Sequence, residues 1–328
     1  MQAAYATGTD PSNPLDHLAV GEIEPGKTPD DWITVHVRGA TVNHHDLWTL
    51  RGPAPVGGLP MILGTDAAGV TDDGREVIIH SVLGDVDAGQ GDDTCDPDRH
   101  LLSERVPGTL AERVRVPSRN MVDKPSELTW TDAACLPTAW LTAFRMLTTK
   151  GQAQPGETVL VQGAAGGVST AALLLAKAMG LRVWVTSRDQ EKRRWALELG
   201  ADAAFETGEP VHHPVDLVIE TVGAATWQHS VASARVGGRI VVSGITSGAM
   251  PPADLLSILA KVITVHGSVM GTTAELARLA KFLVLTGVRP VVDRVFPLSE
   301  AGEAFTAMEA GTVRGKLVLV PDAVHGLD

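Results

Sequence analysis

A glycine-rich turn gives the clearest chemical signal in the sequence. Residues 157–162 contain a short β-branched apolar run, residues 163–168 carry almost no side chains, and an apolar segment with helical spacing then ends at Gly180. This order predicts a strand, a turn and a helix. A phosphate can approach the backbone of such a turn, where the N–H groups and the dipole of the first helical turn attract its charge. We therefore predict a pyrophosphate-binding turn made of Ala164, Ala165, Gly166, Gly167 and Val168.

A second apolar run, residues 182–187, bears on the choice of dinucleotide. It ends about 20 residues beyond the glycines, where the Rossmann pattern places the residue that meets the adenosine ribose. An NAD site favours Asp or Glu there, whereas this chain has Ser187 and Arg188, followed by Lys192. A hydroxyl and cations bind a 2′-phosphate that a carboxylate would repel, so the sequence favours NADPH as the cofactor. The alternative is that residues 188–194 form the solvated face of the next helix, and for Arg193 and Arg194 that alternative is the stronger one.

The composition excludes several classes of partner. The 328 residues include 27 basic and 39 acidic side chains, and the net charge of −12 disfavours nucleic acid and anionic membranes. No apolar run approaches the roughly 18 residues that span a bilayer, and the N-terminus lacks signal-peptide features, so we expect a cytoplasmic protein. Two cysteines exclude a disulfide framework and a four-cysteine zinc site. The single tyrosine, Tyr5, excludes a mechanism that needs a tyrosine acid beside a lysine deep in the chain.

The N-terminal third is predicted to be a small β-rich domain. Short strands separated by Gly and Pro turns are expected at residues 32–38, 76–81 and 112–116. An acidic loop follows His80 and ends near Pro107. It lacks the regularly placed carboxylates and the closing Glu of a calcium-binding loop, so we interpret it as a solvated loop.

From residue 128 onward, helices alternate with strands. A helix over 132–147 leads to the strand before the glycine turn, and further helices are expected at 190–199 and around 226–234. The strands expected after it are 203–205, 216–220 and 238–243. This alternation predicts an α/β domain with a parallel sheet, whose ligand lies at the carboxyl ends of the strands. The residues that would line the cofactor there are Thr221, Val222, Gly223, Ser243, Gly244 and Ile245, although either glycine alone is equally explained as strand-to-loop punctuation.

Several motifs, taken in order, resemble the medium-chain dehydrogenase/reductase superfamily, and within it the zinc-independent quinone oxidoreductase and enoyl reductase branch. They are residues 43–52, 64–69, 133–143, the turn at Gly163 and residues 314–319. The resemblance implies an α/β fold, with a Rossmann doubly wound parallel sheet domain plus a β-rich GroES-like catalytic domain. It places the NADPH-binding domain at residues 123–269 and the discontinuous GroES-like domain at residues 1–122 and 270–328. It also implies a homodimer, formed through edge strands such as residues 263–269.

The chain departs from the zinc-dependent members of the family at each metal-ligand position. Those members place a cysteine where this chain has Asn43, a His-Glu pair at Thr65 and Asp66, and a further ligand near Thr138. Zinc prefers Cys, His and carboxylate, so we expect no metal. The adjacent pair His44-His45 would not chelate one ion in an extended segment, because neighbouring side chains of a strand point to opposite faces.

Without a Lewis acid, a carbon–carbon double bond conjugated to a carbonyl is an easier substrate than an alcohol. Hydride adds at the β-carbon, and hydrogen bonds hold the resulting enolate. The candidate catalytic residues are Asn43, His45 and Trp48, where Trp48 stands in the position of a tyrosine in related quinone reductases and donates without exchanging a proton. The alternatives are that Trp48 packs beside the cofactor and that His45 has a purely structural role.

Three further roles come from the resemblance or from charge. Thr142 corresponds to the family position that meets the nicotinamide amide, and Lys316 to the basic residue near the pyrophosphate. Asp46 and Arg51 are expected to pair with each other. The sequence thus predicts an NADPH-dependent reductase of quinones, enones or enoyl thioesters. An alcohol or ketone oxidoreductase, and an NADPH-binding protein without catalysis, are the competing hypotheses.

Overall fold

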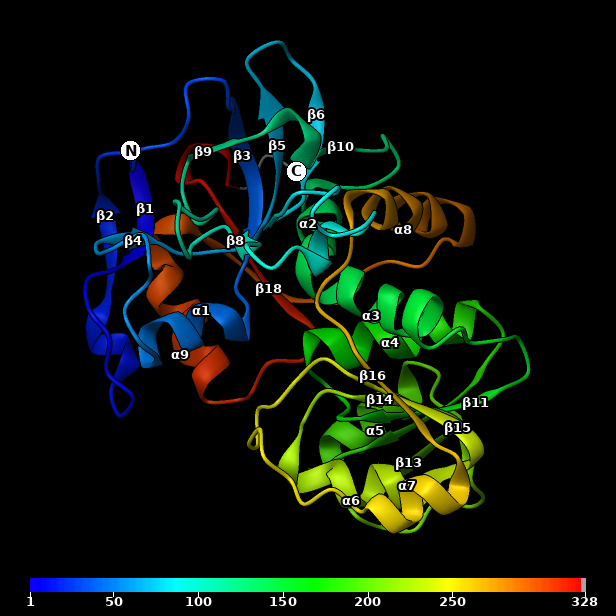
Figure 1. The fold of residues 1–328 in the computed structure, drawn as a ribbon. Helices are drawn as coiled ribbons and strands as arrows, with labels where there is room; N and C mark the ends of the chain where they lie inside the picture. Colours follow the sequence, from blue (N-terminus) through cyan, green and yellow to red (C-terminus); the bar gives the residue numbers. More distant parts are fainter. Residues whose placement is uncertain (326–328) are drawn as a thin grey trace. The chain divides into compact units, whose positions relative to one another are not determined.

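A computed structural model describes residues 1–325, so the last three residues of the predicted segment 270–328 lie outside the described part. The chain divides into two compact units, Met1–Ala139 with Thr272–Asp328, and Trp140–Gly271. Within the described residues, no helix is long and apolar enough to cross a membrane. Figure 1 shows the helices and strands of both units.

The first unit is built mainly from antiparallel strands. Its larger sheet has the order β10-β6-β5-β3-β18-β17, with β9 also paired to β3, and a smaller sheet has the order β2-β1-β4. The strands expected at 32–38, 76–81 and 112–116 are confirmed as β3, β6 and β9. The strands of this unit are β1 (Gln2–Ala6), β2 (Leu18–Glu22), β3 (Ile33–Thr41), β4 (Met61–Ile62), β5 (Asp66–Thr71), β6 (Glu76–Ile79), β7 (Val82–Leu83), β8 (His100–Leu101), β9 (Arg113–Val116), β10 (Met121–Asp123), β17 (Val292–Pro297) and β18 (Lys316–Val320).

The C-terminal segment completes this sheet. Strand β18, red in Figure 1, pairs antiparallel with the blue strand β3, where Val318 faces Thr41. On the other side of β3, strand β5 pairs so that Asp66 faces Thr41. The first residues of β5 and β18 therefore lie beside the last residue of β3 at one end of the sheet. Strands β3 and β5 come from the N-terminal part of the chain, whereas β18 comes from its C-terminal part.

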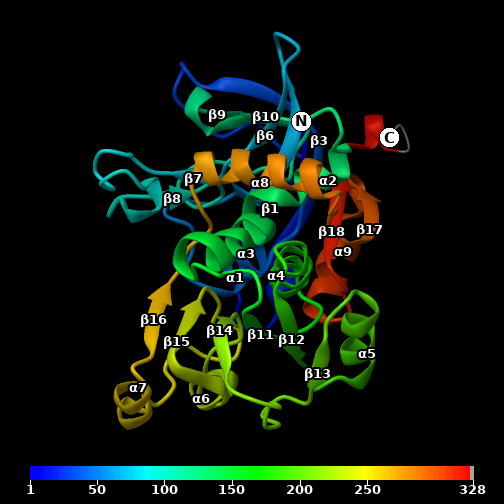
Figure 2. The ribbon, with the colours of Figure 1, turned by 90° about the vertical axis from the view of Figure 1, so that its right-hand side faces the viewer.

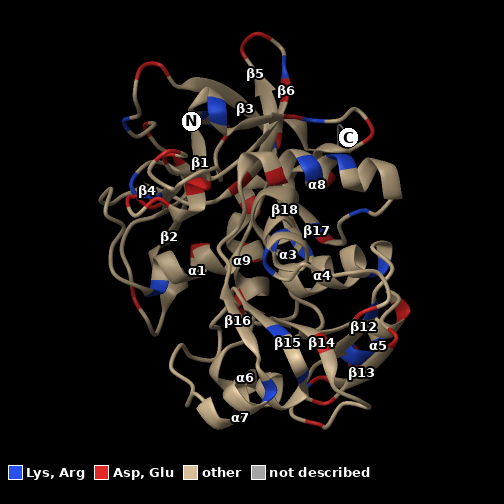
Figure 3. Cartoon of the chain, turned by 45° about the vertical axis from the view of Figure 1, so that its right-hand side comes forward, with Lys and Arg blue, Asp and Glu red and all other residues tan. Residues whose placement is uncertain are grey.

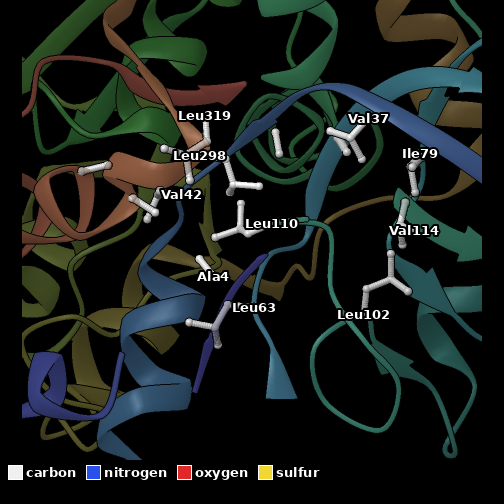
Figure 4. Packing of buried hydrophobic residues seen from close by; sticks show 14 of the residues in the cluster. Ala4, Val37, Val42, Leu63, Ile79, Leu102, Leu110, Val114, Leu298 and Leu319 are labelled. Carbon is white, nitrogen blue, oxygen red and sulfur yellow. The ribbon is translucent and has the colours of Figure 1, made fainter. Parts of the chain in front are cut away.

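The core of this unit lies between the sheets and helix α9 (Ala301–Glu309). Figure 4 shows residues from both ends of the chain packed together, among them Ala4, Val37, Leu110 and Leu319. Burial of apolar surface of this kind is the main favourable term in folding. The other helices of the unit are α1 (His44–Arg51), α2 (Trp130–Ala134) and α8 (Thr273–Thr286), and α8 lies beside β10 (Figure 2).

The segment 123–139 groups with the β-rich unit, whereas the sequence placed it with the nucleotide-binding domain. Helix α2 packs against β3 and β5, so tertiary contacts hold it there. The helix expected over 132–147 is continuous but uneven, because wider π-helical turns at Leu136–Trp140 and Met146–Lys150 flank α3 (Leu141–Arg145).

The second unit contains a parallel sheet with the order β13-β12-β11-β14-β15-β16, which Figure 2 shows strand by strand. Its strands are β11 (Thr158–Gln162), β12 (Arg182–Thr186), β13 (Ala203–Phe205), β14 (Val215–Glu220), β15 (Ala234–Val242) and β16 (Thr264–Gly267). In sequence order this is 3-2-1-4-5-6, the doubly wound dinucleotide-binding arrangement, so the Rossmann prediction is confirmed. The helices that cross between strands are α4 (Gly167–Ala178), α5 (Gln190–Glu198), α6 (Ala224–Ser233) and α7 (Leu255–Lys261).

Candidate active site

The segment that begins at Asn43 is a helix rather than the extended chain considered for His44 and His45. Asn43 precedes α1, and its backbone N–H donates to Asp46 Oδ2 at 2.8 Å, which closes the first turn. Asp46 Oδ1 accepts from the N–H of Gly64 at 2.9 Å. Because successive residues of a helix point about 100° apart, His44 and His45 still diverge.

The predicted pair between Asp46 and Arg51 is wrong. Arg51 Nη2 instead donates to Glu309 Oε1 of α9 at 2.8 Å, while Asp46 is fully buried and serves backbone N–H groups. Burial raises the pKa of Asp46 to about 6, and the nearby His45 and the backbone donors oppose that rise. The carboxyl therefore holds the start of α1 against the loop at Gly64.

A buried ammonium lies at the end of the sheet where β3, β5 and β18 meet. Lys316 is only 3% exposed, and its Nζ donates to Asn43 Oδ1 at 2.6 Å, to Asp66 Oδ2 at 3.2 Å and to the carbonyl of Val42 at 3.3 Å. Asp66 Oδ2 also accepts from the hydroxyl of Thr41. An ammonium has three N–H groups, and these acceptors use all of them. This differs from the pyrophosphate contact implied for Lys316, because no N–H remains for a phosphate.

The three positions compared with zinc ligands are brought together. Asn43 Nδ2 donates to Asp66 Oδ2 at 2.9 Å and to Thr65 Oγ1 at 3.3 Å, and Thr65 Oγ1 lies 3.0 Å from Thr138 Oγ1. Both N–H groups of the Asn43 amide are thus used inside the protein, so it is not the free substrate donor that the sequence suggested. An amide, two hydroxyls and one carboxylate that is already paired with a buried ammonium do not fit zinc, which binds a set of thiolate, imidazole or carboxylate ligands. Among residues 1–325, no group of three His, Cys, Asp or Glu side chains is placed to hold a metal ion.

His45 has a partner that the sequence did not reveal. Its Nε2 lies 3.1 Å from Glu104 Oε1, and Glu104 Oε2 accepts from the N–H of Leu101 at 2.7 Å. Burial lowers the pKa of His45, but the hydrogen bond to Glu104 and the charges of Asp46 and Glu104 outweigh it and raise the pKa overall. The other ring nitrogen, Nδ1, is buried and has no hydrogen-bond partner among the described residues.

Trp48, one turn further along α1, is 42% exposed. Its distance of three residues from His45 puts the two side chains on one face of the helix. An indole held mostly inside the core would favour the packing role, and this one is accessible to a ligand. Its catalytic role stays a prediction.

The glycine turn of the second unit has the shape expected of a phosphate site. Gly163 has φ of +99°, and a Cβ at Gly163 or Gly166 would meet no atom closer than 3.6 Å outside its chain neighbours, so the face of the turn is open. Gly166 precedes α4 and offers no capping side chain. The first N–H groups of a helix have no intrahelical acceptor, and here the oxygens of a phosphate can accept from them. Ala164 and Ala165 complete the turn, and Gly167 and Val168 are the first residues of α4.

The end of β12 carries cations, as the sequence suggested. Ser187 follows β12, and Arg188 is exposed with no partner among the described residues. The carboxylate of Asp189 is used as the cap of α5, where it accepts from the N–H of Glu191 at 2.8 Å. Arg194 pairs with Glu191, as expected for a solvated helix face. Figure 3 marks the Lys and Arg residues of α5, which include Lys192, in blue.

A buried carboxylate organises the loop after β14. Glu220 is fully buried, and its Oε1 accepts from the N–H groups of Val222 at 2.8 Å and of Gly223 at 3.0 Å. Its Oε2 accepts from the hydroxyl of Ser230 at 2.6 Å. Glu220 thus fixes two of the predicted cofactor-lining residues, and in the sequence it is visible only as an acid at the end of an apolar strand.

The remaining residues predicted to line the cofactor lie at the carboxyl ends of β14 and β15 or on α3. Thr221 donates its hydroxyl to the carbonyl of Gln162 at 2.9 Å, beside the glycine turn. The hydroxyl of Ser243 is 3.0 Å from Met146 Sδ, Gly244 packs against the backbone of Thr221, and Ile245 is exposed. Thr142 is buried in α3. Their contacts with a cofactor stay predictions.

Comparison with known proteins agrees with this geometry. Residues 29–126 match the family described as "Alcohol dehydrogenase GroES-like domain" and residues 167–284 match "Zinc-binding dehydrogenase". An alcohol dehydrogenase of Geobacillus stearothermophilus is 30% identical over 329 residues, which cover 93% of this chain and 96% of that protein. The chain belongs to the medium-chain dehydrogenase/reductase superfamily. The GroES-like prediction for the β-rich unit is therefore confirmed.

Other members of the superfamily match along the whole chain. An acryloyl-coenzyme A reductase of Sulfurisphaera tokodaii is 27% identical over 339 residues, covering 98% of this chain and all of that protein. The crystal structure of an NAD-dependent alcohol dehydrogenase matches with a TM-score of 0.87 at 29% identity, covering 98% of this chain and 99% of that one. This protein is accordingly an oxidoreductase of the superfamily that depends on a nicotinamide dinucleotide, and the open glycine turn of its second unit fits that group.

Proposed function

We propose that this protein is an NADPH-dependent reductase of a carbon–carbon double bond conjugated to a carbonyl, as in a quinone, an enone or an enoyl thioester, and that it works without zinc. The observation that carries the proposal is the buried Lys316 ammonium, 2.6 Å from Asn43 and 3.2 Å from Asp66. This fixed cation repels a second cation. The nearby carboxylate of Asp66 is already paired with it, and the surrounding amide and hydroxyls are poor zinc ligands.

The bound dinucleotide would supply a hydride for the β-carbon of the substrate. The protein's own groups then need to hold the negative charge that develops on the carbonyl oxygen and to deliver one proton. His45 suits proton delivery, because Glu104 raises its pKa and Nδ1 has no acceptor among the described residues. The accessible indole of Trp48 adds an N–H donor on the same face of α1.

The test is oxidation of NADPH in the presence of a chelator, with quinones, alkyl enones and enoyl-CoA esters as acceptors. Chelator-resistant turnover of a conjugated acceptor is expected. Zinc at one ion per chain in the purified protein, together with activity that a chelator abolishes, would overturn the proposal. Tight binding of NADPH with no turnover of any acceptor would favour the non-catalytic alternative.

A second candidate, alcohol or ketone oxidoreductase, is favoured by the names of relatives such as the Geobacillus alcohol dehydrogenase. It needs a group that stabilises an alkoxide, and the described residues near Asn43 offer no set that fits a metal Lewis acid. Oxidation of alcohols with NADP or NAD, faster than reduction of any enone, would establish this candidate instead.

The preference for NADPH is proposed from Ser187 and Arg188, and one substitution tests it. Replacing Arg188 by Ala is expected to weaken NADPH binding about tenfold or more while leaving NADH nearly unchanged, because the guanidinium would pair with the 2′-phosphate alone. Dissociation constants from quenching of tryptophan fluorescence measure both.

Arg194→Ala is the matched control, because Arg194 is a nearby arginine on α5 that pairs with Glu191. It should leave both dissociation constants unchanged. Equal losses of NADPH and NADH in Arg188→Ala would refute the 2′-phosphate assignment.

We also propose a homodimer through the edge of the parallel sheet. Strand β16 ends that sheet, and apolar residues of β16 and of the preceding helix α7 are exposed, namely Leu255, Leu256, Leu259 and Val265. Exposed apolar side chains gathered at a sheet edge are typical of an interface. Sedimentation velocity should show a dimer, and a monomer at micromolar concentration would contradict it.

A further inference from the structure

The hydrogen bonds around Lys316 have a fixed direction. An ammonium only donates, so the atom of Asn43 that lies 2.6 Å from it must be the amide oxygen. The amide nitrogen then faces the carboxylate of Asp66 at 2.9 Å and Thr65 Oγ1 at 3.3 Å, both of which accept. The chemistry of its neighbours thus leaves one orientation for this amide.

The proton of the Thr65 hydroxyl also has a fixed direction. Thr65 is fully buried, and its hydroxyl oxygen accepts from Asn43. Its own proton needs an acceptor, because an unsatisfied buried hydroxyl is costly. Thr138 Oγ1, 3.0 Å away, is the acceptor available among the described residues. Thr65 therefore donates to Thr138.

The chain of donors ends at Thr138. Its hydroxyl oxygen accepts from Thr65, and no further hydrogen-bond partner of this side chain is found in residues 1–325. Unlike Asn43, Thr65 and Lys316, Thr138 is partly exposed. It also lies in the wide π-helical turn Leu136–Trp140, a backbone feature that is frequent at functional sites.

We propose that the Thr138 hydroxyl is a catalytic hydrogen-bond donor to the carbonyl oxygen of the substrate, and that Lys316, Asn43 and Thr65 are positioning residues that aim its proton outward. Each bond polarises the next in the same sense, from the ammonium through the amide and the first hydroxyl. The positive charge of Lys316 thereby polarises the O–H of a partly exposed residue, at a position where the resemblance places a zinc ligand in other members of the family. This inference rests on the proposed reduction of a conjugated carbonyl.

The reaction step balances without a further reactant. The β-carbon receives the hydride, the π electrons of the double bond move toward the carbonyl, and the oxygen becomes an enolate oxyanion. The Thr138 O–H donates a hydrogen bond to that oxyanion and keeps its proton. The α-carbon then takes a proton from a separate acid, for which His45 is the candidate, and the carbonyl is restored.

Thr138→Val removes the hydroxyl at nearly constant shape. With the best conjugated acceptor, its kcat should fall about 10²-fold, as for the loss of one oxyanion donor, while the dissociation constant for NADPH stays unchanged. Thr138→Ser keeps the O–H and should retain kcat within a few-fold. Thr65→Val leaves the hydroxyl of Thr138 but cuts its link to the ammonium, and it should give an intermediate loss in kcat with an intact fold by circular dichroism.

The outcomes separate this inference from the proposed function. If the unmodified protein reduces no conjugated acceptor, the proposed function fails. If it does, and Thr138→Val turns over as fast as the unmodified protein, the assignment of Thr138 is overturned. Equal kcat in Thr65→Val and the unmodified protein would overturn the positioning chain. A Thr138→Ser variant as slow as Thr138→Val would show that packing at this site, rather than the hydroxyl, limits turnover.

Discussion

Replacing Lys316 by Met is expected to destabilise the protein by about 3–5 kcal/mol, the usual cost of leaving one buried charge without its partner. Lys316 and Asp66 are 3% and 0% exposed, and their charged atoms lie 3.2 Å apart. Without the ammonium, Asp66 Oδ2 keeps only the Thr41 hydroxyl and the Asn43 amide, both neutral. Urea unfolding followed by circular dichroism measures the difference.

Two further variants make that result specific. Lys316→Met combined with Asp66→Asn removes both charges and should recover most of the lost stability, because no unpaired charge remains. Lys177→Met is the surface control, since the pair of Lys177 with Asp202 is about one-third exposed and should be worth about 0–1 kcal/mol. A Lys316→Met variant no less stable than Lys177→Met would refute the buried ion pair.

The double variant also separates stability from catalysis. If the ammonium acts only as a counter-ion for Asp66, the refolded double variant should recover turnover together with stability. We expect stability to return while kcat stays low, because the donor chain to Thr138 has lost its charged end. Full recovery of kcat would show that the charge of Lys316 has no part in the reaction.

The second large effect is expected at His45. His45→Gln should lower kcat about 10²-fold or more with NADPH binding unchanged, because general acid catalysis contributes about 10²–10⁴-fold. In the unmodified protein, turnover should be highest where His45 is protonated and should fall as the pH rises through its pKa, which the contact with Glu104 holds above the ordinary value for histidine. The dependence of kcat on pH between 5 and 10 measures this.

Glu104→Gln is the matched variant for that profile. It keeps a hydrogen-bond acceptor for His45 Nε2 but removes the charge, so the pKa of His45 should drop and the alkaline fall in kcat should move to lower pH. An unchanged profile in Glu104→Gln, or undiminished turnover in His45→Gln, would leave His45 with a structural role.

The same contact affects stability with a definite sign. Because the folded-state pKa of His45 is raised above its unfolded value, the contact stabilises the fold fully below the unfolded pKa. This contribution is lost as the pH rises through the folded pKa. Both side chains are partly exposed, at 21% and 40%, so solvent screening keeps the effect small.

The sequence alone determined the nucleotide-binding unit well. Local periodicity predicts the strand at 158–162 and the helix that ends near Gly180, and the backbone freedom of glycine predicts the open turn between them. These features depend on residues that are neighbours in the sequence. The parallel sheet followed from the alternation of strands and helices, and the family resemblance implied its doubly wound arrangement. The positive charges after β12 were also predicted from the sequence, because they depend only on which residues stand there.

Only the tertiary structure decided the chemistry of the β-rich unit. The contact between His45 and Glu104 joins residues 59 apart, and the bonds of Lys316 to Asp66 and Asn43 join residues 250 and 273 apart. No local pattern encodes such pairs. The contacts of Lys316 form because β18 and β5 both pair with β3. The sequence therefore named Asn43, His45 and Lys316 but gave two of them the wrong partners. The direction of the proton on Thr138 follows from which neighbours donate and which accept, and that is known only once the chain has folded.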